Sequence, residues 1–209
     1  MRKDILTQDA QAALTPSSVL EQLKTGNARY TTNNLTQADH NELRMASVSG
    51  QAPKAIVLSC IDSRVVVEDV FDQKLGDIFV ARVAGNFANT DIIASMEYAC
   101  KVAGSKLIVV LGHEGCGAVK AACDGVQLGN ITSLLANIQP AVDVVKSQVS
   151  EPHNSQNTDF VNASILKNVS HTIAQIRSMS PILAELESAG DIAIMGGVYQ
   201  LASGEVHWI

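Results

Sequence analysis

A short apolar run that stops at a group of polar side chains constrains this chain more than any other feature. Residues Ala55–Leu58 are numerous enough for a buried β-strand and too few for a helix. Cys60, Asp62 and Arg64 follow almost at once. In an open α/β sheet, binding and catalytic groups collect at the carboxyl edge of the parallel strands, so we interpret this segment as part of a site. Taken alone, a buried cysteine beside a surface Asp–Arg pair is the simpler alternative.

A second strand-like run changes that weighing. Leu107–Leu111 leads into His113 and Cys116, so the ends of two strands carry Cys60, His113 and Cys116. Two thiolates and one imidazole suit zinc, and three protein ligands leave open the fourth position that a catalytic zinc needs. The sequence therefore predicts one Zn²⁺ per chain. Asp62 is the alternative oxygen ligand for the fourth position.

Alternating strand and helix patterns predict the fold. Further strand-like runs occur at Ile78–Ala81 and Ile192–Tyr199, with a possible edge strand at Glu205–Ile209. Helical spacing between the runs favours parallel strands joined by right-handed crossovers. We expect a single α/β domain over residues 1–209: a mostly parallel four- to five-stranded sheet flanked by helices, with an N-terminal helical arm within residues 1–35. Helices are expected over residues 15–30, 65–72, 88–103, 131–149, 160–179 and 182–189, with one more ending at residue 123.

The composition excludes several classes of protein. A chain of 209 residues, 46% apolar and 17% charged, suits one globular domain. Its net charge of −6 and the lack of a basic run argue against a nucleic-acid partner, and no apolar stretch is long enough to cross a bilayer. Four cysteines do not make a disulfide scaffold in a chain of this size. Met1–Leu6 has no apolar core behind its basic residues, so we expect a cytoplasmic location, or a periplasmic one if a leader was removed.

The order of these motifs resembles a known family. Cys60-x-Asp62-Ser63-Arg64 followed by His113-x-x-Cys116 is similar to the signature of the β-class carbonic anhydrases, and Arg82–Asn86 resembles the segment that connects its two halves. The likeness covers nearly the whole chain. It implies the zinc-dependent, reversible hydration of CO₂ to bicarbonate and a proton, by attack of a zinc-bound hydroxide.

The resemblance also implies roles for individual side chains. Asp62 accepts a hydrogen bond from the hydroxide, and Arg64 holds Asp62 ionised and oriented. Whether Asp62 can instead turn onto the zinc and close the site stays open. For the substrate-binding residues, packing in the core is an equally good interpretation. These residues are Gln51, Phe79, Ala84 and Tyr98.

Other features of the resemblance concern assembly and regulation. In the family, an N-terminal helix such as Thr15–Tyr30 reaches across to a neighbouring subunit, which implies a homodimer or a dimer-of-dimers tetramer; packing on its own domain is the alternative. Relatives regulated by bicarbonate carry Trp where this chain has Val57, so we expect no such inhibition. Glu114 is either a proton relay or, more simply, a solvated loop charge.

Three other functions are compatible with part of the pattern. The same zinc centre could hydrolyse COS or CS₂, as some proteins of this fold do, and access to the pocket would decide. A non-catalytic zinc protein would be expected to lack Asp62 or Arg64, and both are present. A thiol oxidoreductase would be expected to carry a Cys-x-x-Cys motif, and there is none.

Overall fold

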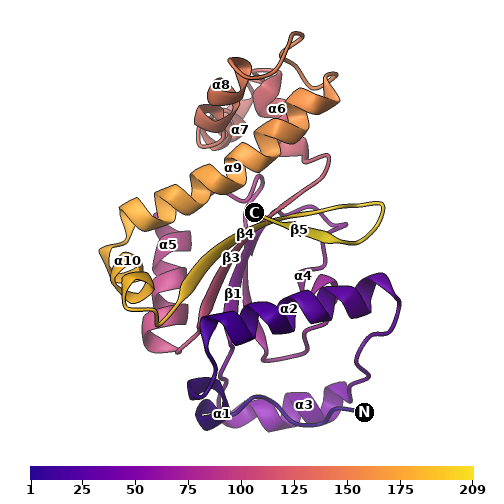
Figure 1. Ribbon diagram of the computed structural model, residues 1–209, viewed down its shortest axis with the longest axis vertical. Helices are drawn as coiled ribbons and strands as arrows, with labels where there is room; N and C mark the ends of the chain where they lie inside the picture. The colour runs from indigo at the N-terminus through magenta and orange to yellow at the C-terminus, as the bar shows by residue number, and fades with distance from the viewer.

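A five-stranded sheet forms the centre of the molecule in the computed structural model, which describes all of residues 1–209 (Figure 1). Its strand order is β2-β1-β3-β4-β5. The first four strands are parallel and β5 is antiparallel to β4, which confirms the predicted mostly parallel α/β sheet. The strands are β1 (Ala55–Ser59), β2 (Ile78–Arg82), β3 (Leu107–His113), β4 (Ala193–Tyr199) and β5 (Val206–Trp208).

Helices cover both faces of the sheet, and Figure 1 shows the long α9 crossing one face while α2 lies across the other. The N-terminal part contains α1 (Gln8–Ala12), α2 (Pro16–Thr31), α3 (His40–Ala46) and the 3₁₀-helix η1 (Ser47–Ser49). The middle contains α4 (Val67–Val70), α5 (Thr90–Glu97) continued by the π-helical turn η2 (Tyr98–Val102), and α6 (Gly117–Cys123). The last part contains α7 (Gly129–Leu135), α8 (Gln139–Lys146), α9 (Thr158–Met179) and α10 (Pro181–Ser188).

Each central strand is buried on both faces, which explains its continuous apolar sequence. Ile56 and Leu58 of β1 belong to a cluster of 29 buried residues beneath α5, α6 and α8–α10. Ala55 and Val57 point the other way, into a cluster of 13 beneath α2 and α4. This alternation fixes the register of β1, so the residue that follows the strand emerges at a defined point of the carboxyl edge.

Glycines let α9 lie close to the sheet. A Cβ on Gly112 of β3 would come within 2.7 Å of Val169 Cγ2, and one on Gly196 of β4 within 2.8 Å of Val169 Cγ1. Side chains larger than hydrogen at these two positions would push the helix away. The helix therefore holds the end of β3, and the loop that follows it, in place.

The predicted N-terminal helix is confirmed, and its packing is now defined. Thr15 caps α2 by accepting from the Ser18 N–H at 3.2 Å, and Pro16 occupies its first turn. Val19 and Leu23 are fully buried against the chain's own sheet, so the helix packs on its own domain. The α1 helix was not predicted; the Gln11 Nε2 group anchors it by donating to the Pro53 and Ala103 carbonyls.

The prediction of one helix over residues 131–149 is wrong. Two helices, α7 and α8, occupy this part of the chain, and they are separated by the turn at 136–138. Pro140 explains the break, because it lacks an N–H and its ring clashes with the carbonyl four residues earlier. In the structure Pro140 lies in the first turn of α8, where neither defect matters.

No helix of the chain has both the length and the apolar character that crossing a bilayer would require.

Candidate metal centre

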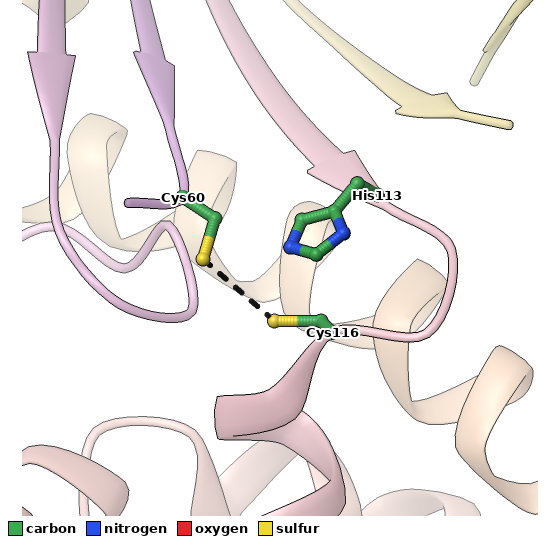
Figure 2. A group of neighbouring side chains, drawn as sticks. All are labelled: Cys60, His113 and Cys116. Atoms are coloured by element: carbon green, nitrogen blue, oxygen red, sulfur yellow. Dashed lines mark hydrogen bonds between the residues drawn. The ribbon is translucent and has the colours of Figure 1, made fainter. Parts of the chain in front are cut away.

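Three predicted metal ligands meet at the carboxyl edge of the sheet, as Figure 2 shows. Cys60 follows β1, His113 ends β3, and Cys116 is the N-cap of α6. Their ligand atoms all lie within 4.8 Å of one another, with the two Sγ atoms 4.0 Å apart. All three residues are buried. The parallel pairing of β1 with β3 is what brings together ligands that lie far apart in the sequence.

The orientation of the His113 ring suits a metal. Its Nδ1 lies 2.9 Å from the Glu114 carbonyl oxygen. A carbonyl can only accept, so Nδ1 must carry the proton and Nε2 must present a lone pair. This Nε2 is buried and has no hydrogen-bond partner in the protein. An unpartnered buried acceptor is costly unless something binds it, and a soft divalent cation between two sulfurs would do so.

The two thiols share their charge unequally. A hydrogen bond from the Cys116 thiol, supported by the Gly85 N–H, lowers the pKa of Cys60 to about 4, although burial opposes the shift. The Cys60 thiolate and burial together raise the pKa of Cys116. Without a cation the pair therefore keeps one proton. A divalent metal would displace it, because both sulfurs must be thiolates to act as ligands.

Asp62 and Arg64 form a two-pronged ion pair beside the ligands. Arg64 Nε donates to Oδ1 at 2.9 Å and Nη2 to Oδ2 at 2.7 Å, while the Arg64 backbone N–H also donates to Oδ1 at 3.0 Å. These hydrogen bonds hold the pKa of Asp62 well below its usual range. Oδ2 also lies 3.8 Å from His113 Nε2, so the carboxylate adjoins the metal-binding nitrogen. The pair can therefore place an ionised acceptor next to a bound ion.

Arg82 is a positioning residue whose role was not predicted. It ends β2 and donates from Nε to the Cys60 carbonyl at 2.9 Å and from Nη2 to the Asp62 carbonyl at 2.7 Å. One side chain thus fixes the backbone that carries both a ligand and the carboxylate. Only the register of the sheet reveals this role, because Arg82 is the parallel partner of Ser59, the last residue of β1.

Gly85 connects the ligand loop to the rest of the protein. Its N–H lies 3.4 Å from Cys60 Sγ, and its carbonyl accepts from Asn168 Nδ2 of α9 at 2.7 Å. Its φ of +79° favours glycine, and a Cβ here would come within 2.3 Å of Ile138 Cδ1. Ala84, a predicted substrate-pocket residue, directly precedes it and is the one member of that set whose neighbour contacts a ligand sulfur.

The other predicted pocket residues lie away from the metal ligands within one chain. Phe79 pairs with Ile56, four positions before Cys60 and about 13 Å along the strand. Phe79 and Tyr98 make an edge-on contact with ring centroids 6.3 Å apart and line an open, mostly apolar concavity of about 570 Å³. Gln51 precedes β1 and so lies toward the amino edge of the sheet, opposite the metal ligands. The chain by itself does not bring these three to the centre.

The structure also places Glu114 and Val57, two residues singled out in the sequence. Glu114 is partly buried, and its Oε2 accepts from the Leu201 N–H at 3.2 Å, which ties the loop after β3 to the turn after β4. Val57 is fully buried beneath α2, so the position where relatives carry Trp is part of the core here.

Comparison with known proteins agrees with this geometry. The carbonic anhydrase family profile matches residues 55–206. The carbonic anhydrase of Mycolicibacterium smegmatis is 36% identical over 197 residues (91% of this chain, 92% of the relative), and carbonic anhydrase 2 of Mycobacterium tuberculosis is 34% identical over 190 residues (90% of each). Among solved structures, the β-carbonic anhydrase CcaA superimposes with a TM-score of 0.71 at 23% identity (92% of this chain, 90% of that one). A tetrameric β-carbonic anhydrase of Sordaria macrospora gives 0.71 at 21% (92% and 97%). With a β-carbonic anhydrase fold and relatives this similar along nearly its whole length, the chain belongs to the carbonic anhydrase family.

Proposed function

We propose that this carbonic anhydrase hydrates CO₂ at a zinc ion held by Cys60, His113 and Cys116, with Asp62 and Arg64 aligning the nucleophile. The observation that carries the proposal is the unpartnered, buried Nε2 of His113 lying beside two thiols and a carboxylate. When bound, zinc supplies a Lewis acid that lowers the pKa of a coordinated water toward neutrality. Two thiolates and a neutral imidazole would balance the charge of this ion and, as three protein ligands, would leave it open to solvent.

Asp62 orients the nucleophile in this proposal. An ionised carboxylate can only accept hydrogen bonds, so it holds the remaining proton of the nucleophile and turns a lone pair toward the substrate carbon. Arg64 occupies both carboxylate oxygens and keeps the group ionised. Its two-pronged grip would also oppose rotation of Asp62 toward a metal held by the three ligands.

The substrate pocket is proposed to be completed by a second copy of the chain. β2 is an edge strand, and the apolar concavity beside it is lined by Phe79 and Tyr98, with Tyr98 54% exposed and the nearby Val102 71% exposed. Apolar residues exposed along a sheet edge favour association. The solved Sordaria macrospora relative is tetrameric, so we assign the concavity to a second copy, which would supply Phe79 and Tyr98 to the neighbouring centre.

Sedimentation velocity tests this assembly. Val102→Glu places a charge at the end of η2, the turn that begins at Tyr98, and is expected to shift the protein from dimer or tetramer toward monomer, with loss of CO₂ hydration. Val48→Glu is the matched control, because Val48 is equally exposed but lies in η1 before β1. An unchanged sedimentation coefficient for Val102→Glu would place the interface elsewhere.

Stopped-flow CO₂ hydration on metal-quantified protein tests the chemistry. The wild type is expected to hold one zinc per chain and to be active, whereas Cys60→Ser is expected to lose both metal and activity. Cys123→Ser is the matched control, since Cys123 is also buried but the hydrogen bond of its thiol goes to Ser164. Full activity without stoichiometric metal, or in Cys60→Ser, would contradict the proposal.

A further inference from the structure

A second cavity, with polar walls, lies between α2 and the start of β1, at the opposite end of that strand from Cys60. It has a volume of about 530 Å³ and no hydrophobic side chain in its lining. The lining includes the polar side of α2, whose Val19 and Leu23 are fully buried in the core. The cavity walls include two cations, Arg29 and Lys54.

Lys54 is a buried cation without a charged partner. Its residue is only 9% exposed, and its one hydrogen-bond acceptor is the neutral Oε1 of Gln22, at 3.0 Å. No carboxylate lies within ion-pair distance of its Nζ. Burial lowers the pKa of Lys54, Asp77 opposes that shift, and the charges of Arg2 and Arg29 add to it. A buried ammonium with one neutral acceptor is costly unless an anion joins it.

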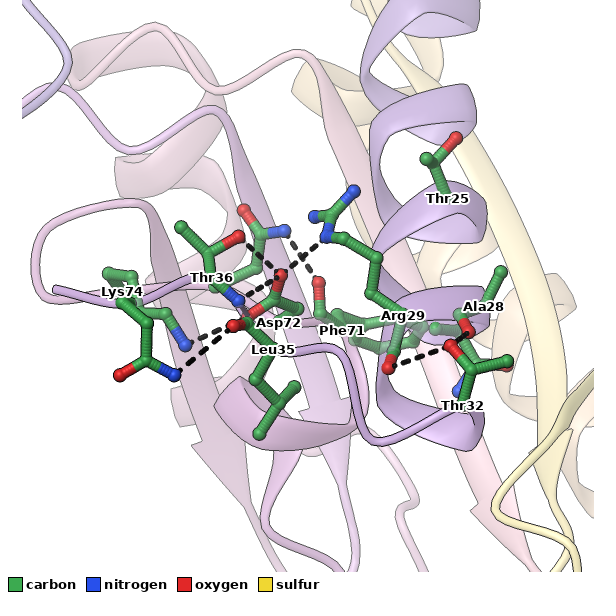
Figure 3. A network of polar contacts seen from close by, with 12 residues as sticks. Thr25, Ala28, Arg29, Thr32, Leu35, Thr36, Phe71, Asp72 and Lys74 are labelled. Atoms are coloured by element: carbon green, nitrogen blue, oxygen red, sulfur yellow. Dashed lines mark hydrogen bonds and ion pairs between the residues drawn. The ribbon is translucent and has the colours of Figure 1, made fainter. Parts of the chain in front are cut away.

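Arg29 has donors to spare. Figure 3 shows it reaching from α2 to Asp72, to which Nε donates at 2.6 Å. Its Nη groups have no partner in the protein. Asp72 is already satisfied by Lys74 Nζ at 2.8 Å and by the Thr36 N–H and hydroxyl groups. The carboxylate therefore leaves much of the Arg29 fork free for another acceptor.

The remaining groups favour an oxyanion that also carries a hydrogen. The lining holds two cations, Arg29 and Lys54, and two carboxylates, Glu21 and Asp72, and Asp72 is also paired with Lys74 outside the lining. Gln73, in the cavity wall, donates from Nε2 to the Phe71 carbonyl at 2.7 Å, which fixes its amide orientation. Its Oε1 is buried without a partner and would accept a hydrogen bond from a hydroxyl group.

We propose that this cavity binds a small hydroxyl-bearing oxyanion, hydrogen phosphate or bicarbonate, between the Lys54 ammonium and the free Nη groups of Arg29. The site is separate from the metal centre, and the inference does not depend on the proposed catalytic mechanism. An anion here would join α2 to the first residue before β1 and so stabilise the docking of that helix. By mass action it would raise the melting temperature by about 3 to 6 °C at ten times its dissociation constant.

Equilibrium dialysis of the zinc-loaded protein against radiolabelled phosphate tests the site. Wild type is expected to bind one phosphate per chain at the cavity, and Lys54→Met to weaken that binding at least about tenfold. Arg29→Lys keeps the charge but loses the fork, and is expected to weaken it less. Lys24→Met is the matched control, because Lys24 is an exposed cation on α2, the helix that carries Arg29. Phosphate bound at the metal would still bind to Lys54→Met, so this variant distinguishes binding in the cavity from binding at the metal.

Melting temperatures give an independent readout. In anion-free buffer Lys54→Met should melt no lower than wild type, and phosphate should raise the melting temperature of wild type and Lys24→Met by more than that of Lys54→Met. Lys54→Met should keep its CO₂ hydration rate, so a failure here is separable from a failure of the catalytic proposal. Displacement of phosphate by bicarbonate would assign the cavity to bicarbonate, and no displacement would assign it to phosphate. Equal binding by Lys54→Met, no saturable binding, a destabilised Lys54→Met, or displacement by equimolar chloride would overturn the proposal.

Discussion

Two aspartates ten positions apart, Asp62 and Asp72, are both paired with arginines, yet their surroundings differ. The Asp72 side chain is fully buried and accepts from Arg29, Lys74 and both donors of Thr36. The Asp62 side chain is 16% exposed, and its side-chain partner at hydrogen-bond distance is Arg64.

The difference separates a carboxylate whose hydrogen bonding is complete from one that is free to play the part proposed for Asp62. Burial acts to raise the pKa of Asp72, but the hydrogen bonds from Lys74, Thr36 and Arg29 outweigh it and lower the pKa to about 2. Every strong lone pair of Asp72 is then occupied, so it can only hold structure. Asp62 is ionised just as firmly, but it adjoins the buried Nε2 of His113 and retains exposed surface for another donor. An ionised carboxylate becomes useful in catalysis when its hydrogen bonding is left incomplete.

Asp62→Asn should give the largest effect, because it replaces the acceptor that aligns the nucleophile by a group that also donates. We expect kcat/KM for CO₂ hydration to fall by about 100- to 1,000-fold. The melting temperature and zinc content should stay near those of wild type. Stopped-flow assays with metal analysis measure all three, and a rate within threefold of wild type would remove Asp62 from the mechanism.

Asp72→Asn should show the reverse pattern. It leaves Arg29 and Lys74 without their buried partner, which costs about 3 kcal/mol. For a chain of this size that lowers the melting temperature by about 6 to 12 °C. The hydration rate per folded molecule should be unchanged at 25 °C. Calorimetry and kinetics on the same sample check the pair of outcomes; a stable but inactive variant would reverse the roles assigned to the two aspartates.

Arg64→Lys should have a smaller effect than loss of the carboxylate itself. A lysine cannot hold both oxygens of Asp62 in a fixed plane, so the acceptor stays ionised but loses its orientation. We expect kcat/KM to fall by about tenfold with little change in KM. Arg44→Lys, at an exposed arginine of α3, is the control and should behave as wild type.

The pH dependence of stability should show the smallest difference. The folded pKa of Asp72 lies below its unfolded value of about 3.9, so its contribution is present above that value and is lost as pH falls toward 2. The gap in melting temperature between wild type and Asp72→Asn should therefore be constant above about pH 5 and narrow between about pH 4 and pH 2. A gap that stays constant down to pH 2 would show that Asp72 is not the titrating group.

The sequence allowed the parts of this site that depend on local pattern to be predicted. Short apolar runs ending at Cys60 and His113 mark strand ends, and parallel strands bring their carboxyl ends to one edge, so the ligand set follows without long-range information. The break at Pro140 was available from sequence and was missed, because the apolar spacing continues across it.

Other parts of the site depend on pairing that no local pattern reveals. Arg82 reaches the Cys60 and Asp62 carbonyls only because its strand lies beside β1 in one particular register. The isolation of Lys54 follows from the way α2 packs over it, and the saturation of Asp72 draws on donors from three separate segments. Such contacts become visible only once the chain is folded.

The parallel pairing of β1 with β3 has a consequence for how the enzyme matures. Cys60 and the His113–Cys116 loop come together only after these two strands have paired. A nascent or thermally unfolded chain would therefore offer a metal separate, flexible groups instead of a preformed site. With the proposed zinc centre, metal uptake would be a late event in biogenesis, and the bound ion would keep the paired strands from separating.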